Sequence, residues 1–172
     1  MRWFRFAFLI TAAAVLQSSA LLGTISLTDM HIKPDLLLIL LVYFAINCDS
    51  YDAIICSFAI GFAADITGAA IGPHFIGFGV LGAALAHIRK VILLKQTRQQ
   101  AVTIFVMGIL TYTLAAILIK FKIPSAAASM FKIFAVSIYS AILWFLVKWL
   151  VRAAGKWLGV GVHRFGIKPE ER

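Results

Sequence analysis

The sequence predicts an all-α integral membrane protein with six transmembrane helices, and two observations carry this prediction. Hydrophobic residues make up 62% of the 172 residues, and the mean hydropathy is +0.97, whereas an ordinary soluble domain is about 45–50% apolar. A soluble core of this small size could not hide so much apolar surface, so lipid is the expected solvent. The apolar segments are also continuous rather than alternating, which favours helices over a barrel.

The apolar runs divide the chain into six predicted spans. Arg2 and Arg5 precede a run that could be a secretory signal, because Ser18-Ser19-Ala20 offers a small-residue cleavage pattern. The run continues to Gly23, however, which makes it long enough to span, so we interpret it as the first membrane helix. The predicted spans cover residues 3–23, 34–47, 51–66, 75–94, 101–119 and 126–150.

Lysine and arginine are distributed unevenly over the predicted loops, and this sets the expected orientation. With both termini in the cytoplasm, the inner side holds twelve basic residues and the outer side holds four. We therefore predict an N-in, C-in topology, and the net charge of +9 is mostly a topology signal. The spans are expected to form one domain, residues 1–152, followed by a basic and partly interfacial cytoplasmic tail at residues 153–172.

Pro34 opens the second predicted helix at its outer end, where the missing N–H costs nothing. Asp35 follows in the expected first turn. The free N–H groups and the positive end of the helix dipole favour a carboxylate there. We therefore expect Asp35 to be charged without a special partner.

Asp65 is the only Asp, Glu, Lys or Arg between Asp52 and Arg89. A carboxylate at the bilayer centre costs about 2.5–3.5 kcal/mol on insertion scales. At about 1.5 Å per residue, Asp65 lies about 20 Å from Asp52, in the outer third of a hydrocarbon core about 30 Å thick. We expect a structural anchor that is solvated from outside, bonds to a helix N-terminus or pairs with a nearby cation. A transported ligand or proton and a partner's membrane helix are the alternatives. Asp65→Asn is accordingly expected to weaken folding or assembly only modestly.

Small residues are concentrated around Asp65 and in the span that follows it. Association of helices in lipid depends on close packing and polar contacts, and small residues allow close approach. The pattern predicts a tight contact between the third and fourth spans, with Gly72-Pro73 in the loop between them. A short span ending in a Gly-rich loop is also compatible with a broken helix that lines a binding site. The candidate structural or partner-contact residues are Pro34, Asp35, Gly61, Asp65, Gly68, Gly72, Gly79 and Gly82.

The end of the last span is amphipathic. Lys148, Arg152 and Lys156 recur every four residues and share one helical face. Trp149 and Trp157 lie among them. Cations beside indoles at the inner surface suit lipid headgroups, so these five residues are the candidate headgroup interface. A docking surface for a cytoplasmic protein is the alternative.

The sequence lacks the common catalytic and metal-binding motifs. It contains no phosphate loop of the Walker type, no GxSxG and no HExxH. His74 and His87 fall at opposite ends of the fourth span, about 20 Å apart by helix rise. Cys48 and Cys56 are expected to be small core residues. We therefore predict a protein that is not an enzyme, with no metal and no cofactor, and the basic residues follow no nucleic-acid motif.

The second predicted span opens with Lys33-Pro34-Asp35 before an apolar run to Tyr43, and the third carries Gly61-Phe62-Ala63-Ala64-Asp65, followed by Gly68 and Gly72. This order of polar and small residues resembles the MreD family of bacterial rod shape-determining membrane proteins. The length, the six spans and the N-in, C-in topology also fit, and the resemblance covers about residues 3–160. Ala63-Ala64 stands where such proteins often carry Gly-Leu-type residues.

The resemblance implies a non-enzymatic scaffold of the cell-elongation machinery in the bacterial inner membrane. The implied partner is MreC, a bitopic protein, with RodA, a class B penicillin-binding transpeptidase and MreB filaments as neighbours. It also implies a fold similar to the substrate-binding membrane subunits of energy-coupling-factor transporters. A small-molecule-binding membrane subunit is therefore the alternative function, and it would need an enclosed outer-side cavity. Its few polar candidates are Thr28, Asp29, Asp35, Asp65, Thr67 and His74.

Overall fold

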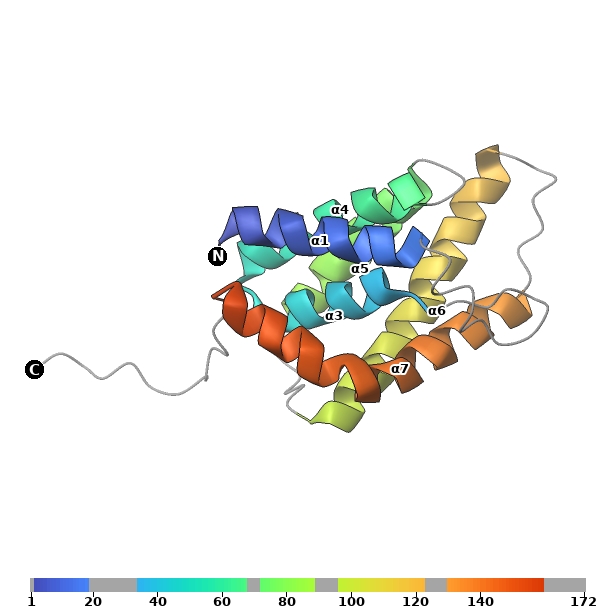
Figure 1. Ribbon diagram of the computed structural model, residues 1–172. Helices are drawn as coiled ribbons and strands as arrows, with labels where there is room; N and C mark the ends of the chain where they lie inside the picture. The colour runs from blue at the N-terminus through green and yellow to red at the C-terminus, as the bar shows by residue number, and fades with distance from the viewer. Residues whose placement is uncertain (1, 19–33, 68–71, 89–95, 123–129, 160–172) are drawn as a thin grey trace, which may run out of the picture.

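The computed structural model describes residues 2–18, 34–67, 72–88, 96–122 and 130–159, and the structural statements below refer to these residues. They form helices only, which confirms the predicted all-α class (Figure 1). Helices α4, α6 and α7 are long and apolar enough to cross a membrane, whereas α1, α3 and α5 are shorter apolar helices. The helices are α1 (Trp3–Ser18), α3 (Leu36–Asn47), α4 (Ser50–Thr67), α5 (Pro73–Ile88), α6 (Thr97–Lys122) and α7 (Met130–Trp157).

Two helix starts differ from the sequence prediction, each for a local reason. Helix α3 begins at Leu36 rather than Pro34, because Asp35 has extended backbone angles (φ −97°, ψ 102°) and acts as the N-cap. Helix α5 begins at Pro73, which was expected in a loop; a proline at the first helical position loses no hydrogen bond. Gly72 precedes it with φ +116°, a conformation that favours glycine.

The other helix ends differ from the predicted spans by a few residues. Helix α6 is longer than its predicted span, and α7 runs continuously to Trp157, past the expected domain boundary at residue 152. The predicted ends of the first and fourth spans, at residues 19–23 and 89–94, lie outside the described residues.

Helix α3 is the centre of the fold and contacts each of the other described helices. Every residue from Leu37 to Ala45 is buried, as expected for a helix that is apolar on all sides. Phe6 of α1 packs edge-on against Phe44, with ring centroids 5.2 Å apart. The polar groups at the two ends of α3 are therefore held inside a ring of helices.

Helices α4 and α5 form a closely packed antiparallel pair, while α6 packs on α7. The start of α1 lies beside the end of α7 (Figure 1). Cys48 and Cys56 are both buried, and neither forms a disulfide within the described residues.

Candidate functional site

The Asp65 carboxylate closes the N-terminus of the following helix. It is 1% exposed and accepts hydrogen bonds from the backbone N–H groups of Gly72 (2.8 Å), His74 (2.9 Å) and Phe75 (2.9 Å). Nδ1 of His74 also lies 3.1 Å from Asp65 Oδ1. The helix N-terminus is therefore the observed anchor of Asp65. The prediction that solvent outside the membrane could solvate the carboxylate was wrong, because the side chain is buried.

The sequence around this site explains why the carboxylate fits. The first N–H groups of a helix have no partner within it, and the helix dipole makes them a favourable site for a negative charge. Gly72 supplies the positive φ that turns the chain, and Pro73 then starts α5 without an N–H that needs an acceptor. Burial of Asp65 in this position is therefore offset by hydrogen bonds to its charged form.

Three of the predicted contact glycines lie where α4 and α5 approach each other. We call Gly61, Gly79 and Gly82 the seam glycines. A Cβ built on Gly61 would lie 2.8 Å from the backbone oxygen of His74 and 2.9 Å from Cα of Phe75. Gly79 faces the ring of Phe58, and Gly82 faces the hydroxyl of Ser57. These glycines therefore pack inside the protein, and their small size is used by the fold itself. Gly68 lies outside the described residues.

Asp35 forms a second buried polar site at the N-terminus of α3, and it is 4% exposed. Its Oδ1 accepts from the backbone N–H of Leu38 (3.0 Å) and from the Gln17 amide of α1 (2.9 Å). The hydroxyl of Tyr112 in α6 donates to its other oxygen, and its own N–H donates to the hydroxyl of Ser140 in α7 (3.0 Å). The expectation that Asp35 needs no special partner was wrong, because three helices that are distant in the sequence, α1, α6 and α7, supply partners.

The two carboxylate sites meet at a pair of rings. The imidazole of His74 lies edge-on to the ring of Tyr112, with centroids 6.2 Å apart. Asp65 contacts the first ring and Asp35 accepts from the second. We call the resulting set the polar network; it takes one residue from each of five described helices and the N-cap of the sixth, α3. Its members are Gln17, Asp35, Asp65, His74, Tyr112 and Ser140.

Sequence reasoning missed three members of this network. Gln17 is the only amide side chain in residues 3–23, and that isolation was an available signal. Tyr112 and Ser140 carry no such signal, because a hydroxyl in an apolar helix often bonds to its own backbone. Ser137, one turn before Ser140, does so with the carbonyl of Ile133 (2.8 Å).

The basic end of α7 lies beside the start of α1. The guanidinium of Arg5 stacks over the Trp157 ring at 5.0 Å and donates to the Trp157 carbonyl (2.8 Å). Trp157 is therefore held partly by the protein itself. Trp149, Arg152 and Lys156 are exposed, as an interfacial face requires, while Lys148 is half-buried.

The polar network has the chemistry of a structural connection. Each carboxylate accepts several hydrogen bonds from the protein, which stabilises its charged form and fixes its geometry. Among the described residues, no group of three or more His, Cys, Asp or Glu side chains is arranged to hold a metal. The fold and the site together define a helical membrane protein whose buried polar groups join its own helices.

The comparison with protein families identifies the family. The model of the MreD family, rod shape-determining protein MreD, matches residues 1–154. The chain therefore belongs to the MreD family, as the ordered Pro-Asp and Gly-Phe-x-x-Asp residues indicated. No curated protein and no solved structure matches the chain.

Proposed function

We propose that this protein is a non-enzymatic membrane scaffold of the cell-elongation machinery. Membership of the MreD family implies a role in rod shape determination. In the proposed role, the protein binds an MreC-like bitopic protein and helps to organise peptidoglycan synthases, with RodA, a class B transpeptidase and MreB as further members of the assembly. The proposed arrangement has six spans with both termini in the cytoplasm.

This proposal is carried by one observation: the polar side chains form hydrogen bonds within the protein itself. Of the six polar candidates for a small-molecule site, the structure describes Asp35, Asp65, Thr67 and His74. The hydroxyl of Thr67 donates to the carbonyl of Ala64 (3.0 Å). Asp65 is used by the backbone of α5, and Asp35 by three neighbouring helices. Thr28 and Asp29 lie outside the described residues. Polar groups used to join helices favour a scaffold over a transporter subunit, which would point them into a cavity.

Affinity purification in detergent tests the proposed partner. The full chain, tagged and expressed in its own host, is expected to recover a single-pass MreC-like protein in stoichiometric amount. Recovery of a bound small molecule without a partner protein would contradict the scaffold. Variants at exposed apolar positions then locate the contact: Phe62→Ala on α4 and Phe134→Ala on α7 remove exposed rings from different helices. Partner recovery should fall for the face that makes the contact while the chain stays folded.

The seam glycines require a separate control. The concentration of small residues after Asp65 predicts that Gly79→Leu disturbs assembly more than Gly23→Leu. Since Gly79 faces Phe58 within the protein, Gly79→Leu should lower the unfolding temperature as well as partner recovery. Unfolding is therefore measured for every variant, and partner loss is assigned to the interface only where folding is unchanged.

A further inference from the structure

The closely packed helices α4 and α5 are short for membrane helices. They contain 18 and 16 residues, whereas α6 and α7 contain 26 and 28. At about 1.5 Å per residue, the first pair is about 24–27 Å long and the second pair about 39–42 Å. A helix needs about 20 residues to cross a hydrocarbon core that is about 30 Å thick. The two helix pairs therefore suit bilayers of different thickness.

The exposed large apolar side chains show the same difference. From the first to the last of them, the apolar band measures about 20–22 Å along α4 and α5, and about 28–40 Å along α6 and α7. The residues that limit these bands are Tyr51 and Ile66 on α4, Phe75 and Ile88 on α5, Val102 and Phe121 on α6, and Met130 and Trp157 on α7.

Polar groups limit the α4–α5 band at both ends. At one end, Asp52 lies in the first turn of α4, and Arg89 and Lys90 follow α5 directly in the sequence. At the other end, the Asp65 carboxylate binds the first N–H groups of α5, and His74 is 21% exposed. Tilt does not lengthen the band, because a tilted helix reaches less far across a bilayer. The α4–α5 band is therefore shorter than an ordinary hydrocarbon core.

The surface of α4 suits acyl chains better than a second helix. Its exposed residues are Tyr51, Ile55, Phe62 and Ile66, and all four are large. Helices that pack closely in lipid use small residues at the contact. Gly61, the one glycine of α4, lies against the backbone of α5 and is buried. The small residue that a partner helix would need is thus already used inside the protein.

We propose that the α4–α5 face is a contact surface for phospholipids with short acyl chains, beside which the bilayer is locally thinned. A hydrophobic stretch shorter than the hydrocarbon core is accommodated by thinning of the bilayer, which has a cost for each ångström of mismatch. Short-chain phospholipids avoid this cost because their hydrocarbon region is already thin. The longer α6–α7 pair does not share the preference. The inference does not depend on the proposed protein partner.

Fluorescence quenching by brominated phospholipids tests the proposal with the full chain in vesicles, without other proteins. A brominated acyl chain quenches a tryptophan that it contacts, so a single surface tryptophan reports the lipids beside one helix. Phe62→Trp reports α4, and Ile138→Trp on α7 is the matched control, because the two positions are 54% and 46% exposed. The background first replaces the tryptophans that reach the surface with phenylalanine: Trp3, Trp149 and Trp157.

Phosphatidylcholines with fourteen-carbon or twenty-two-carbon monounsaturated chains then compete with the brominated lipid. At Phe62→Trp, the fourteen-carbon lipid should bind at least about threefold better than the twenty-two-carbon lipid. At Ile138→Trp, the two lipids should differ by less than about 1.5-fold. Equal binding of the two lipids at Phe62→Trp, or the same preference at both positions, would overturn the proposal.

A second pair of variants needs no reporter tryptophan and replaces the first if the reporters fail to fold. Ile66→Gln shortens the α4 band by four residues, about 6 Å. It should widen the difference in unfolding temperature between fourteen-carbon and twenty-two-carbon vesicles by about 3 °C. Phe121→Gln makes the matching change at the end of α6 and should leave that difference unchanged. Equal shifts for the two variants would contradict the proposal.

Discussion

Asp35 and Asp65 are both buried carboxylates at helix N-termini, yet they are held in different ways. The partners of Asp65 are backbone N–H groups seven to ten residues ahead in the chain. Asp35 is joined to side chains 18, 77 and 105 residues away. The Asp65 site fixes one helix pair, whereas the Asp35 site ties α1, α6 and α7 to the central helix. The first can form as soon as α4 and α5 meet, but the second requires the whole bundle.

The largest expected effect is that of Asp65→Asn. The amide NH₂ would replace an acceptor oxygen and face backbone donors of α5, so the free energy of unfolding should fall by about 3 kcal/mol. This exceeds the modest effect expected from sequence, because three backbone donors depend on the carboxylate. Chemical unfolding in detergent measures it. Lys132→Gln, which removes one charge at an exposed position of α7, is the control and should cost under about 0.5 kcal/mol. Equal losses would mean that the cap contributes nothing.

Gly61→Ala tests whether the same helix pair depends on close approach. The added methyl would meet backbone atoms of His74 and Phe75, which cannot move aside as a side chain can, so the expected loss is about 1–3 kcal/mol. Gly77→Ala is the matched control, because its Cβ would lie 3.4 Å from a Thr111 methyl. That variant should be nearly neutral in the same unfolding assay. A neutral Gly61→Ala would show that the α4–α5 contact is looser than described.

Tyr112→Phe tests the Asp35 site, whose side-chain partners lie far away in the sequence. It removes a hydrogen bond to a charged group, so a loss of about 1.5 kcal/mol is expected. In a double-mutant cycle, Tyr112→Phe with Asp35→Asn should show coupling of about 0.5–3 kcal/mol. Its combination with Asp65→Asn should be additive within about 0.5 kcal/mol. Strong coupling in the second cycle would show that the two sites act as one unit.

The smallest effect is expected for His74→Phe. The variant keeps the backbone N–H that caps Asp65 and an aromatic ring beside Tyr112, and it removes only the contact from Nδ1. The unfolding free energy should change by less than about 1 kcal/mol. A loss as large as that of Asp65→Asn would mean that the imidazole, rather than the backbone of α5, holds the carboxylate.

The features that could be predicted from the sequence depend on residues that lie close together in the chain. The continuous apolar runs predicted the helices, and the small residues after Ala59 predicted the α4–α5 contact. A helix N-terminus was one of the expected anchors for Asp65, because the donors lie only a short loop away. Errors at Pro34 and Pro73 were also local: both concerned which residue near a proline takes the first helical position, and these boundaries depend on the cap.

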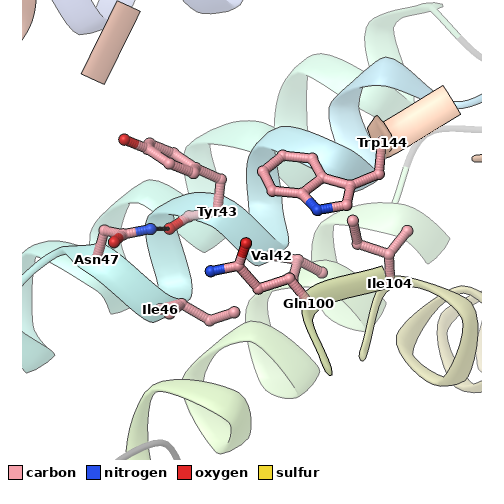
Figure 2. A pocket seen from close by; sticks show the side chains of 7 residues that line it. All are labelled: Val42, Tyr43, Ile46, Asn47, Gln100, Ile104 and Trp144. Atoms are coloured by element: carbon pink, nitrogen blue, oxygen red, sulfur yellow. Dashed lines mark hydrogen bonds between the residues drawn. The ribbon is translucent and has the colours of Figure 1, made fainter. Parts of the chain in front are cut away.

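The Asp35 site could not be predicted in the same way. Its partners lie in separate helices, and each of them has an ordinary role available within its own helix. Gln17 and Ser140 reach Asp35 only because α1 and α7 both pack on α3 at suitable depths. The burial of Trp144 is similar, since it depends on how α7 lies against α3 and α6 (Figure 2).

The sequence by itself determined that this chain is helical, suited to lipid and a member of the MreD family, because hydropathy, helix period and the ordered Pro-Asp and Gly-Phe-x-x-Asp residues are properties of the chain alone. Only the tertiary structure decided which groups satisfy the two carboxylates. The reason is physical: backbone donors at a neighbouring helix end are fixed by short spacing, whereas side-chain partners depend on the depth and rotation at which distant helices pack.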